Sequence, residues 1–204
     1  MIKLYGCPRT RSVRASWALE EAGAPYAYER IELAKGDVRK PAFLAINPFG
    51  KLPVLVDGDW VLTESAAIVT YIGEKFPASG LVPEDQRARA EYFQWTAFAI
   101  AELEQPLWTL AKHHFALPKD LRVAAIRPSA LWEFARAVKV LDQHMQGRAF
   151  AVGDRFTGAD VLIGHTLGWA KNTDVPLESE RLEQYAERML SRPALEAARQ
   201  RELA

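Results

Sequence analysis

The sequence predicts an α/β domain followed by an all-helical domain. Its first third alternates short strand candidates with helical segments, an order that favours a sheet with helical crossovers. The composition changes after Pro77, because two prolines and a glycine fall within residues 77–84 and the later segments show helical periodicity. We therefore expect an α/β domain over residues 1–77, a linker over residues 78–86 and a helical domain over residues 87–204.

The α/β domain is expected to have the element order β-α-β-α-β-β-α. Gly23 is placed to end the first helix, because glycine adopts the left-handed conformation after a helix at little cost. Asp57 and Gly58, between two apolar runs, are a common signature of a short hairpin, so the last two strands should be antiparallel. The strand candidates are residues 2–6, 26–33, 52–56 and 60–62, and the clearest helix candidates are residues 12–22 and 65–76.

Two apolar stripes with steps of three and four residues predict packed helices in the second domain. Pro106 falls inside the first of these helices and should kink it, whereas Pro118 should end it. Thr157, followed three residues later by Asp160, predicts a capped helix start, which is a structural signal and not a catalytic one. The stripes are Tyr92, Trp95, Ala99, Leu103 and Leu107, and Leu131, Phe134, Val138, Leu141 and Met145.

The composition excludes several classes of function. The 26 basic and 26 acidic residues balance, so the chain lacks the broad positive field that nucleic-acid binding requires. No apolar run approaches the ~18 residues needed to cross a bilayer. A single cysteine, Cys7, forms no intramolecular disulfide and supports no thiolate-rich zinc site. We therefore expect a protein of the reducing cytoplasm that binds neither nucleic acid nor membrane.

Glu64 and Ser65 stand at the head of a predicted helix, where they suit a zwitterionic ligand. The first amides of a helix lack intrahelical partners, so a bound carboxylate gains hydrogen bonds from them and from the Ser65 hydroxyl. Glu64 can then accept an ammonium group from the same ligand. Serine and glutamate are also favoured at helix starts in proteins of any function, so a purely structural role for this pair stays open.

Lys51, Leu52 and Pro53 precede a predicted strand and offer a backbone edge to a peptide ligand. The residue before a proline is driven to an extended conformation, and a cis bond between Leu52 and Pro53 would turn the amide and carbonyl of Leu52 outward. A peptide ligand can pair with such an edge. The alternative is a proline that merely begins a strand, and the sequence does not distinguish the two.

Four segments of the chain resemble the cytosolic glutathione transferases. They are residues 4–10 (L-Y-G-C-P-R-T), 47–53 (N-P-F-G-K-L-P), 64–68 (E-S-A-A-I) and 156–160 (F-T-G-A-D). The segments span both domains, and the resemblance implies a thioredoxin-like N-terminal domain followed by an all-helical one. It also implies a cytoplasmic homodimer with a role in detoxification, which uses glutathione as co-substrate and no further cofactor.

The resemblance assigns the glutathione-binding residues by their positions. Leu52 would pair its backbone with the cysteinyl part of glutathione, and Pro53 would be the family's cis proline. Glu64 and Ser65 would hold the γ-glutamate, and Lys51 would approach the glycyl carboxylate. The second substrate is expected to be a small, largely apolar electrophile.

Two hydroxyl residues in the turn after the first strand compete for the catalytic position. Thr10 stands where the serine-type members of the family have their catalytic serine, and its hydroxyl would donate to the bound sulfur. Ser12 is the second candidate, because one bacterial branch has an active cysteine-serine pair at the positions of Arg11 and Ser12. Arg11 departs from that pattern. For one of the two hydroxyls, the role must be a cap at the start of the helix over residues 12–22.

Cys7 supports a rival activity. Residues 7–10 (C-P-R-T) resemble the C-P-x-C site of glutaredoxins with the second cysteine replaced by threonine, and omega-like transferases have a cysteine at this place. A thiolate at Cys7 would form a mixed disulfide with glutathione and make the protein a thiol transferase. The alternative is a small residue that ends the strand. We expect Thr10 to be the working group, and a non-enzymatic glutathione-binding protein on the same fold stays open.

Hydrogen bonding is sufficient for the hydroxyl mechanism, which requires no metal. A thiol with a pKa of about 8.5 is only ~3% ionised at neutral pH, and lowering that pKa by about two units takes about 2.7 kcal/mol of thiolate stabilisation. A hydrogen bond to a charged group contributes about 1.5–3 kcal/mol, and a helix N-terminus contributes about 0.3–1 kcal/mol. The two together reach the required value.

Arg9, Arg11 and Arg14 form a basic cluster next to this turn. They can draw an anionic peptide towards the site or favour its thiolate. The alternative is a set of solvated arginines on an exposed helix face.

Trp108, His113 and Phe115 are candidates for contact with the electrophile. They fall where the helical domain of the resembled family usually lines the acceptor pocket. The adjacent His113 and His114 cannot share one helix face, and the four histidines of the chain show no spacing typical of metal ligands.

Overall fold

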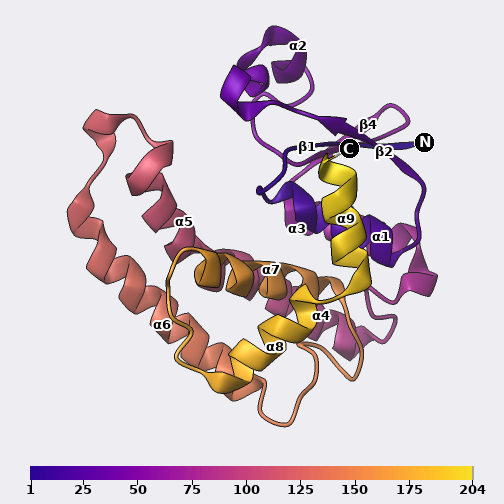
Figure 1. Ribbon diagram of the computed structural model, residues 1–204. Helices are drawn as coiled ribbons and strands as arrows, with labels where there is room; N and C mark the ends of the chain where they lie inside the picture. The colour runs from indigo at the N-terminus through magenta and orange to yellow at the C-terminus, as the bar shows by residue number, and fades with distance from the viewer. Residues whose placement is uncertain (204) are drawn as a thin grey trace. The chain divides into compact units, whose positions relative to one another are not determined.

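The computed structural model describes residues 1–203, which form two compact units (Figure 1). The first unit comprises Met1–Val82 together with the C-terminal segment that begins at Ser191, and the second comprises Pro83–Leu190. We expected the C-terminal segment in the helical domain because the whole chain after residue 84 reads as helix, but it packs on a helix of the first unit. Helical periodicity identifies an apolar face and does not identify the surface that covers it.

The first unit has the predicted order β-α-β-α-β-β-α, with one further helix from the C-terminus. Its strands are β1 (Ile2–Gly6), β2 (Tyr26–Arg30), β3 (Val54–Asp57) and β4 (Trp60–Thr63). Its α-helices are α1 (Ser12–Glu21), α2 (Pro41–Leu44), α3 (Ser65–Lys75) and α9 (Pro193–Leu203), with single 3₁₀ turns at Leu33–Lys35, Asp37–Arg39 and Pro77–Ser79. This architecture is the thioredoxin-like domain that the resemblance implied.

The four strands form one mixed sheet in the order β2-β1-β3-β4. Strand β1 runs parallel to β2 and antiparallel to β3, and β3 and β4 form the predicted hairpin. Figure 1 shows α1 and α3 on one side of the sheet and α2 on the other. Leu4 and its partner Leu55 are fully buried, and the neighbouring Tyr5 points to the other face, where its ring meets Phe43 of α2 with centroids 6.3 Å apart.

Two strands are shorter than predicted. Strand β2 ends at Arg30 and is followed by the 3₁₀ turn Leu33–Lys35, and β3 begins at Val54, after Pro53. The helix-ending role of Gly23 is confirmed, since its φ is 59° and its N–H donates to the carbonyl of Glu20 at 3.1 Å.

The second unit is all-helical, as predicted. Its longer elements are α4 (Gln86–Phe98), a first π-helix (Ala99–Glu104), α5 (Gln105–Ala111), a second π-helix (Lys112–Ala116), α6 (Arg127–His144), α7 (Gly158–Asn172) and α8 (Glu180–Leu190). Both predicted apolar stripes are buried except at Leu131, which is half-buried. Within residues 1–203, no helix combines the length and the apolar character that crossing a membrane requires.

The long helix expected around Pro106 changes its hydrogen-bonding pattern there. The π-helix Ala99–Glu104 ends directly before α5, whose first turn contains Pro106. Proline lacks the N–H of a helix interior but is tolerated in the first turn, so a restarted helix accommodates it. The second π-helix ends at Ala116, shortly before Pro118, which confirms the predicted helix end.

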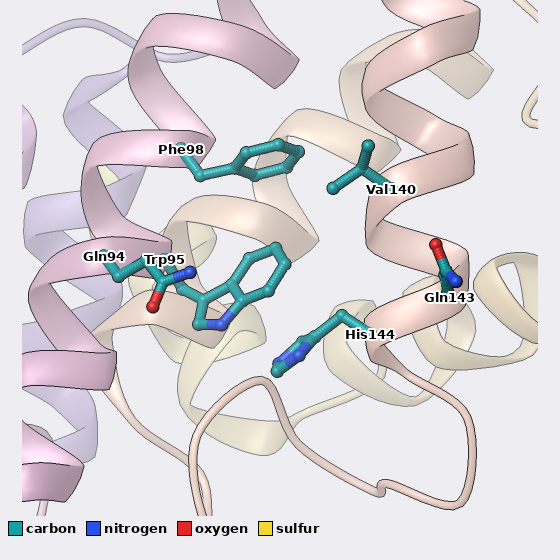
Figure 2. Close-up of a pocket in the computed structure, with 6 residues that line it drawn as sticks. All are labelled: Gln94, Trp95, Phe98, Val140, Gln143 and His144. Atoms are coloured by element: carbon teal, nitrogen blue, oxygen red, sulfur yellow. The ribbon is translucent and has the colours of Figure 1, made fainter.

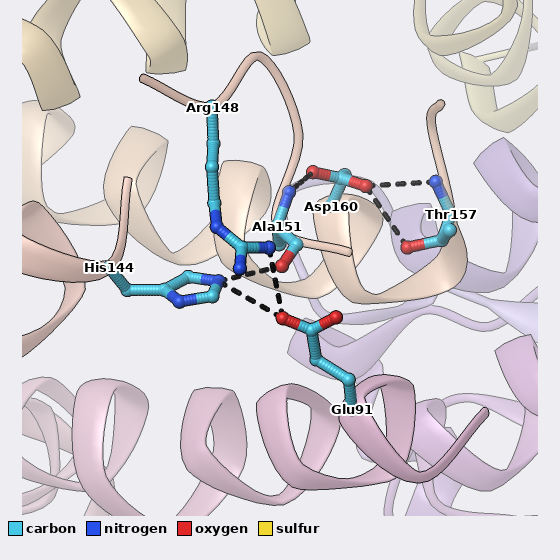
Figure 3. Close-up of polar contacts among 6 residues, drawn as sticks. All are labelled: Glu91, His144, Arg148, Ala151, Thr157 and Asp160. Atoms are coloured by element: carbon cyan, nitrogen blue, oxygen red, sulfur yellow. Dashed lines mark hydrogen bonds and ion pairs between the residues drawn. The ribbon is translucent and has the colours of Figure 1, made fainter. Parts of the chain in front are cut away.

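The predicted capped start of α7 is confirmed, and Asp160 is its centre. The carboxylate of Asp160 accepts the N–H and the hydroxyl of Thr157 at 2.8 and 3.0 Å and the N–H of Ala151 at 2.8 Å (Figure 3). It also accepts the hydroxyl of Tyr185 at 2.7 Å. Asp160 is fully buried, and this burial raises its pKa against the opposing effect of the four donors.

Candidate active site

The sheet brings the predicted ligand-binding segments to one of its ends. Tyr5 of β1 pairs with Val54 of β3, which pairs with Thr63 of β4. The chain that follows Tyr5, the chain that precedes Val54 and the chain that follows Thr63 therefore meet at the same end of the sheet. These three segments are the predicted catalytic turn, residues 51–53 and the start of α3.

Residues 7–12, between β1 and α1, are here called the hydroxyl turn. The hydroxyl of Thr10 donates to the carbonyl of Cys7 at 2.7 Å and lies 2.8 Å from the hydroxyl of Ser12. The Ser12 hydroxyl accepts the N–H of Cys7 at 3.2 Å, and the N–H of Ser12 donates to the Thr10 hydroxyl at 3.2 Å. Ser12 is fully buried and Thr10 is half-buried, so Thr10 is the more exposed of the two residues.

Arg14 differs from the two other arginines of the predicted basic cluster. Arg9 is exposed and Arg11 is half-buried, but Arg14 is fully buried. Its Nη1 donates to the hydroxyl of Ser65 at 3.2 Å, which connects α1 to the first residue of α3. A buried guanidinium beside Ser65 adds a fixed positive charge to a helix N-terminus that already favours anions.

Glu64 precedes α3 in a strained conformation. Its φ of 67° lies in the left-handed region, which is uncommon for a residue other than glycine and often marks a functional site. The Glu64 side chain is exposed and makes no capping bond to α3, so the purely structural role of a side-chain cap is not observed. The next residue, Ser65, is 4% exposed.

Asn47 organises the loop that precedes β3. Its buried side-chain amide donates to the carbonyl of Lys51 at 2.8 Å and accepts the N–H of Phe49 at 3.1 Å. Gly50, with φ of 59°, completes the turn, because a Cβ at this position would lie 2.7 Å from the carbonyl of Val38. Asn47 is therefore a positioning residue that the pattern of residues 51–53 alone does not reveal.

The bond between Leu52 and Pro53 is cis, as the resemblance implied. The backbone of Leu52 lies outside the ladder of β1 and β3, whose last pair joins Tyr5 and Val54. Lys51 is exposed beside it. The side chain of Leu52 packs against the small core cluster formed by Val38, Phe43 and Val54.

The three acceptor candidates lie in one stretch of the helical unit. Trp108 is half-buried in α5, and His113 and Phe115 follow in the second π-helix. The Nδ1 of His113 accepts the N–H of Val123 at 3.0 Å, which orients its ring, and Phe115 is 64% exposed.

A pocket of about 320 Å³ in the helical unit lies elsewhere, between α4 and α6 (Figure 2). The rings of Trp95 and His144 stack in its wall with centroids 3.7 Å apart. None of the three acceptor candidates lines it. Its lining residues are Gln94, Trp95, Phe98, Val140, Gln143 and His144.

Known protein families match both parts of the chain. The glutathione S-transferase N-terminal domain matches residues 1–74, and the glutathione S-transferase C-terminal domain matches residues 124–197. A glutathione S-transferase of Xanthomonas campestris pv. campestris is 32% identical over 203 residues, which cover 98% of each chain.

Solved structures of the same family superpose over nearly the whole chain. A glutathione S-transferase from Xylella fastidiosa has a TM-score of 0.87 and 31% identity, and the match covers 99% of this chain and 98% of that one. A sphingomonad glutathione S-transferase complexed with glutathione has a TM-score of 0.84 and 31% identity over 98% of each chain. With both family domains in order and relatives aligned from end to end, the chain belongs to the glutathione S-transferase family and is a glutathione transferase.

Proposed function

We propose that the chain binds glutathione at the sheet end described above and joins its thiolate to a small, largely apolar electrophile. The observation that carries this proposal is the buried Arg14, whose guanidinium holds the hydroxyl of Ser65 at the start of α3. The hydroxyl turn lies at the same sheet end. One small peptide can therefore place a carboxylate at Ser65 and a thiol near Thr10.

The γ-glutamyl end of glutathione binds at the start of α3. Because Ser65 accepts a hydrogen bond from Arg14, its own proton is free to donate to the ligand carboxylate, together with the first amides of α3. The ligand ammonium group meets the exposed carboxylate of Glu64. The cysteinyl part pairs with the backbone of Leu52, next to the cis proline, and the glycyl carboxylate approaches Lys51.

The chemical step begins with ionisation of the glutathione thiol. The Thr10 hydroxyl turns from the carbonyl of Cys7 to the sulfur and donates a hydrogen bond to the thiolate, while the thiol proton leaves to solvent. The buried Ser12 hydroxyl donates to Thr10 and strengthens it as a donor. The thiolate then forms a carbon–sulfur bond with the electrophile, whose leaving group departs or whose new carbanion takes a proton from water.

Replacing Ser65 with alanine should weaken glutathione binding about 10-fold or more, because a hydrogen bond to a charged group contributes about 1.5–3 kcal/mol. Titration calorimetry of the purified chain measures this affinity. Ser129 is an exposed serine of the helical unit, and its alanine variant is the matched control, expected to bind as the wild type does. A wild-type chain that takes up no glutathione would overturn the proposed function.

A second candidate function is glutathione-dependent thiol transfer by Cys7, which is favoured by its free, half-buried thiol in the hydroxyl turn. In this reaction the Cys7 thiolate attacks the glutathionyl sulfur of a mixed disulfide and releases the substrate thiol. The thiolate of a second glutathione then attacks the protein-bound glutathionyl sulfur, which restores Cys7 and forms glutathione disulfide.

We propose that the protein acts as a cytoplasmic homodimer, needs no cofactor besides its co-substrate, and contacts the electrophile with Trp108, His113 and Phe115. Each unit exposes several large apolar side chains, and association with a second copy would remove such side chains from water. They include Phe49, Trp60 and Val61 of the first unit and Phe93, Trp132 and Val140 of the second. Light scattering should give the mass of two chains, and the mass of one chain would contradict the dimer.

A further inference from the structure

Helix α9 and the residue before it, Arg192, are joined to α1 by two ion pairs and by one buried carboxyl. Arg201 donates to Glu20 at 2.8 Å, and Arg192 donates to both carboxylate oxygens of Glu21 at 2.5 and 2.8 Å. Figure 1 shows α9 beside α1. Glu202 of the same helix is only 2% exposed, so its carboxyl is enclosed by the surfaces that α9 covers.

A chain of hydrogen bonds leads from Glu202 to the hydroxyl turn. The hydroxyl of Ser16 lies 3.1 Å from the Oε1 of Glu202 and 3.3 Å from the carbonyl of Ser12. The link then passes through the residue itself, because the side-chain hydroxyl of Ser12, and not its carbonyl, lies 2.8 Å from the hydroxyl of Thr10. Ser12 and Ser16 are both fully buried, so solvent does not replace these contacts.

Tyr28 lies in β2, a strand that α9 also contacts, and packs next to the hydroxyl turn. A Cβ on Gly6 would lie 2.4 Å from the Tyr28 hydroxyl, so this ring packs directly against the residue that precedes Cys7. The buried hydroxyl of Tyr28 makes no hydrogen bond within residues 1–203, so it acts on the turn through packing alone. Burial, and then the charge of Glu202, raise the pKa of Tyr28.

We propose that Glu202 is a positioning residue for the hydroxyl turn, which it steadies through Ser16 so that the hydroxyl of Thr10 reaches the glutathione thiolate. Glu202 itself touches no substrate. This inference rests on the proposed function, because it concerns the same site and the same chemical step.

The support that Glu202 gives to the turn changes near neutral pH. Burial raises the pKa of Glu202 to about 7, against the effect of the Ser16 and Tyr28 hydroxyls. The hydroxyl of Ser16 can donate one hydrogen bond, either to Glu202 or to the carbonyl of Ser12. When Glu202 is ionised, its carboxylate accepts this hydrogen bond. When Glu202 is protonated, its carboxyl group donates to Ser16, and the Ser16 hydroxyl donates to the carbonyl of Ser12. The other titratable or charged groups around Glu202 and Tyr28 are Tyr26 and Arg30 of β2, Cys7, Arg199 and Arg201.

The test uses the whole chain with glutathione and 1-chloro-2,4-dinitrobenzene, an aromatic electrophile. Glu202→Ala should lower kcat/KM about 10-fold and raise the thiol pKa of bound glutathione, because misplacing a reacting group by about 1 Å costs up to about 100-fold. Glu202→Gln keeps the hydrogen-bonding shape without the charge. It should restore most of kcat and remove the contribution of Glu202 to the rate profile near pH 7, leaving only the titration of the bound thiol. Glu196→Gln, which removes an exposed charge from the same helix, should match the wild type.

The melting temperature gives an independent measure of the same carboxyl. Because the pKa of Glu202 is raised from 4.5 to about 7 on folding, the folded chain binds more protons between these two values. This group therefore makes the fold less stable as pH rises from about 4.5 to about 7 and adds no further change above that range. Glu202→Gln should lack this part of the fall in melting temperature.

The outcomes separate this inference from the proposed function. If Glu202→Ala fails to fold, Ser16→Ala makes the same test, because it removes only the hydroxyl link. A folded variant at either position with the kcat/KM, thiol pKa and pH profile of the wild type overturns the positioning role alone. A wild type that neither binds nor conjugates glutathione overturns the proposed function instead.

Discussion

Thr10→Ala should lower kcat/KM for glutathione conjugation between about 10- and 100-fold and raise the thiol pKa of bound glutathione by about one to two units. The hydroxyl donates to a charged sulfur in this mechanism, and such a bond contributes about 1.5–3 kcal/mol. Thr10 is also the more exposed of the two hydroxyl-bearing residues in the turn. Steady-state kinetics and ultraviolet titration of the bound thiolate measure both effects.

Two further variants separate the hydroxyl from its surroundings. Thr10→Ser keeps the donor and should restore most of the lost rate. Cys7→Ala should leave conjugation close to wild type, but it should abolish the reduction of a glutathionylated peptide if thiol transfer is the activity. Wild-type kinetics together with an unshifted thiol pKa in Thr10→Ala would eliminate the role of Thr10.

The meeting of the binding segments at one sheet end follows from short-range signals in the sequence. The hairpin signal at Asp57 and Gly58 sets β3 against β4, and the helix-start signal at Glu64 and Ser65 follows β4 directly. Of the pairings that bring these segments together, that of β1 with β3 is the long-range one. These local rules are enough to predict the order of the strands and helices, whereas the thioredoxin-like domain and the binding residues were implied by the family resemblance.

The burial of Arg14 was not predicted, because charge patterning treats an arginine in a short helix as solvated. The sequence holds a signal for it nonetheless. Val13, Ala15 and Trp17 surround Arg14 with small or apolar side chains, and the structure buries every residue of α1 from Ser12 to Leu19. A helix with no polar face is covered on all sides, so a charge on it is buried and needs a polar partner.

The position of α9 was beyond sequence reasoning for a different reason. Its contacts join residues far apart in the chain, as in the pairs of Arg201 with Glu20 and Arg192 with Glu21. Helical periodicity compares residues only three or four positions apart, so it does not indicate which distant segment a helix contacts. The contacts from Glu202 to the hydroxyl turn depend on the packing of α9 against α1. They could not be predicted from the sequence for the same reason.

Asp160→Ala should lower the free energy of unfolding by about 4 kcal/mol or more, the largest effect expected for any single change in the helical unit. The substitution removes one acceptor from four donors on Ala151, Thr157 and Tyr185, all of which are buried. Each buried donor left without a partner costs about 1–3 kcal/mol. Urea denaturation followed by circular dichroism measures the loss.

Matched variants show how the loss at Asp160 is distributed. Tyr185→Phe removes one donor together with its need for an acceptor, and should cost about 1 kcal/mol. Asp160→Asn keeps the side-chain volume and one acceptor oxygen, but its amide N–H₂ group faces at least one of the donors. The loss of unfolding free energy should therefore lie between those of Tyr185→Phe and Asp160→Ala. Because burial raises the pKa of Asp160, the carboxylate depends on these donors to stay ionised. An Asp160→Ala variant as stable as the wild type would mean that the four hydrogen bonds only offset the desolvation cost of the buried carboxylate. They would then contribute no net stability.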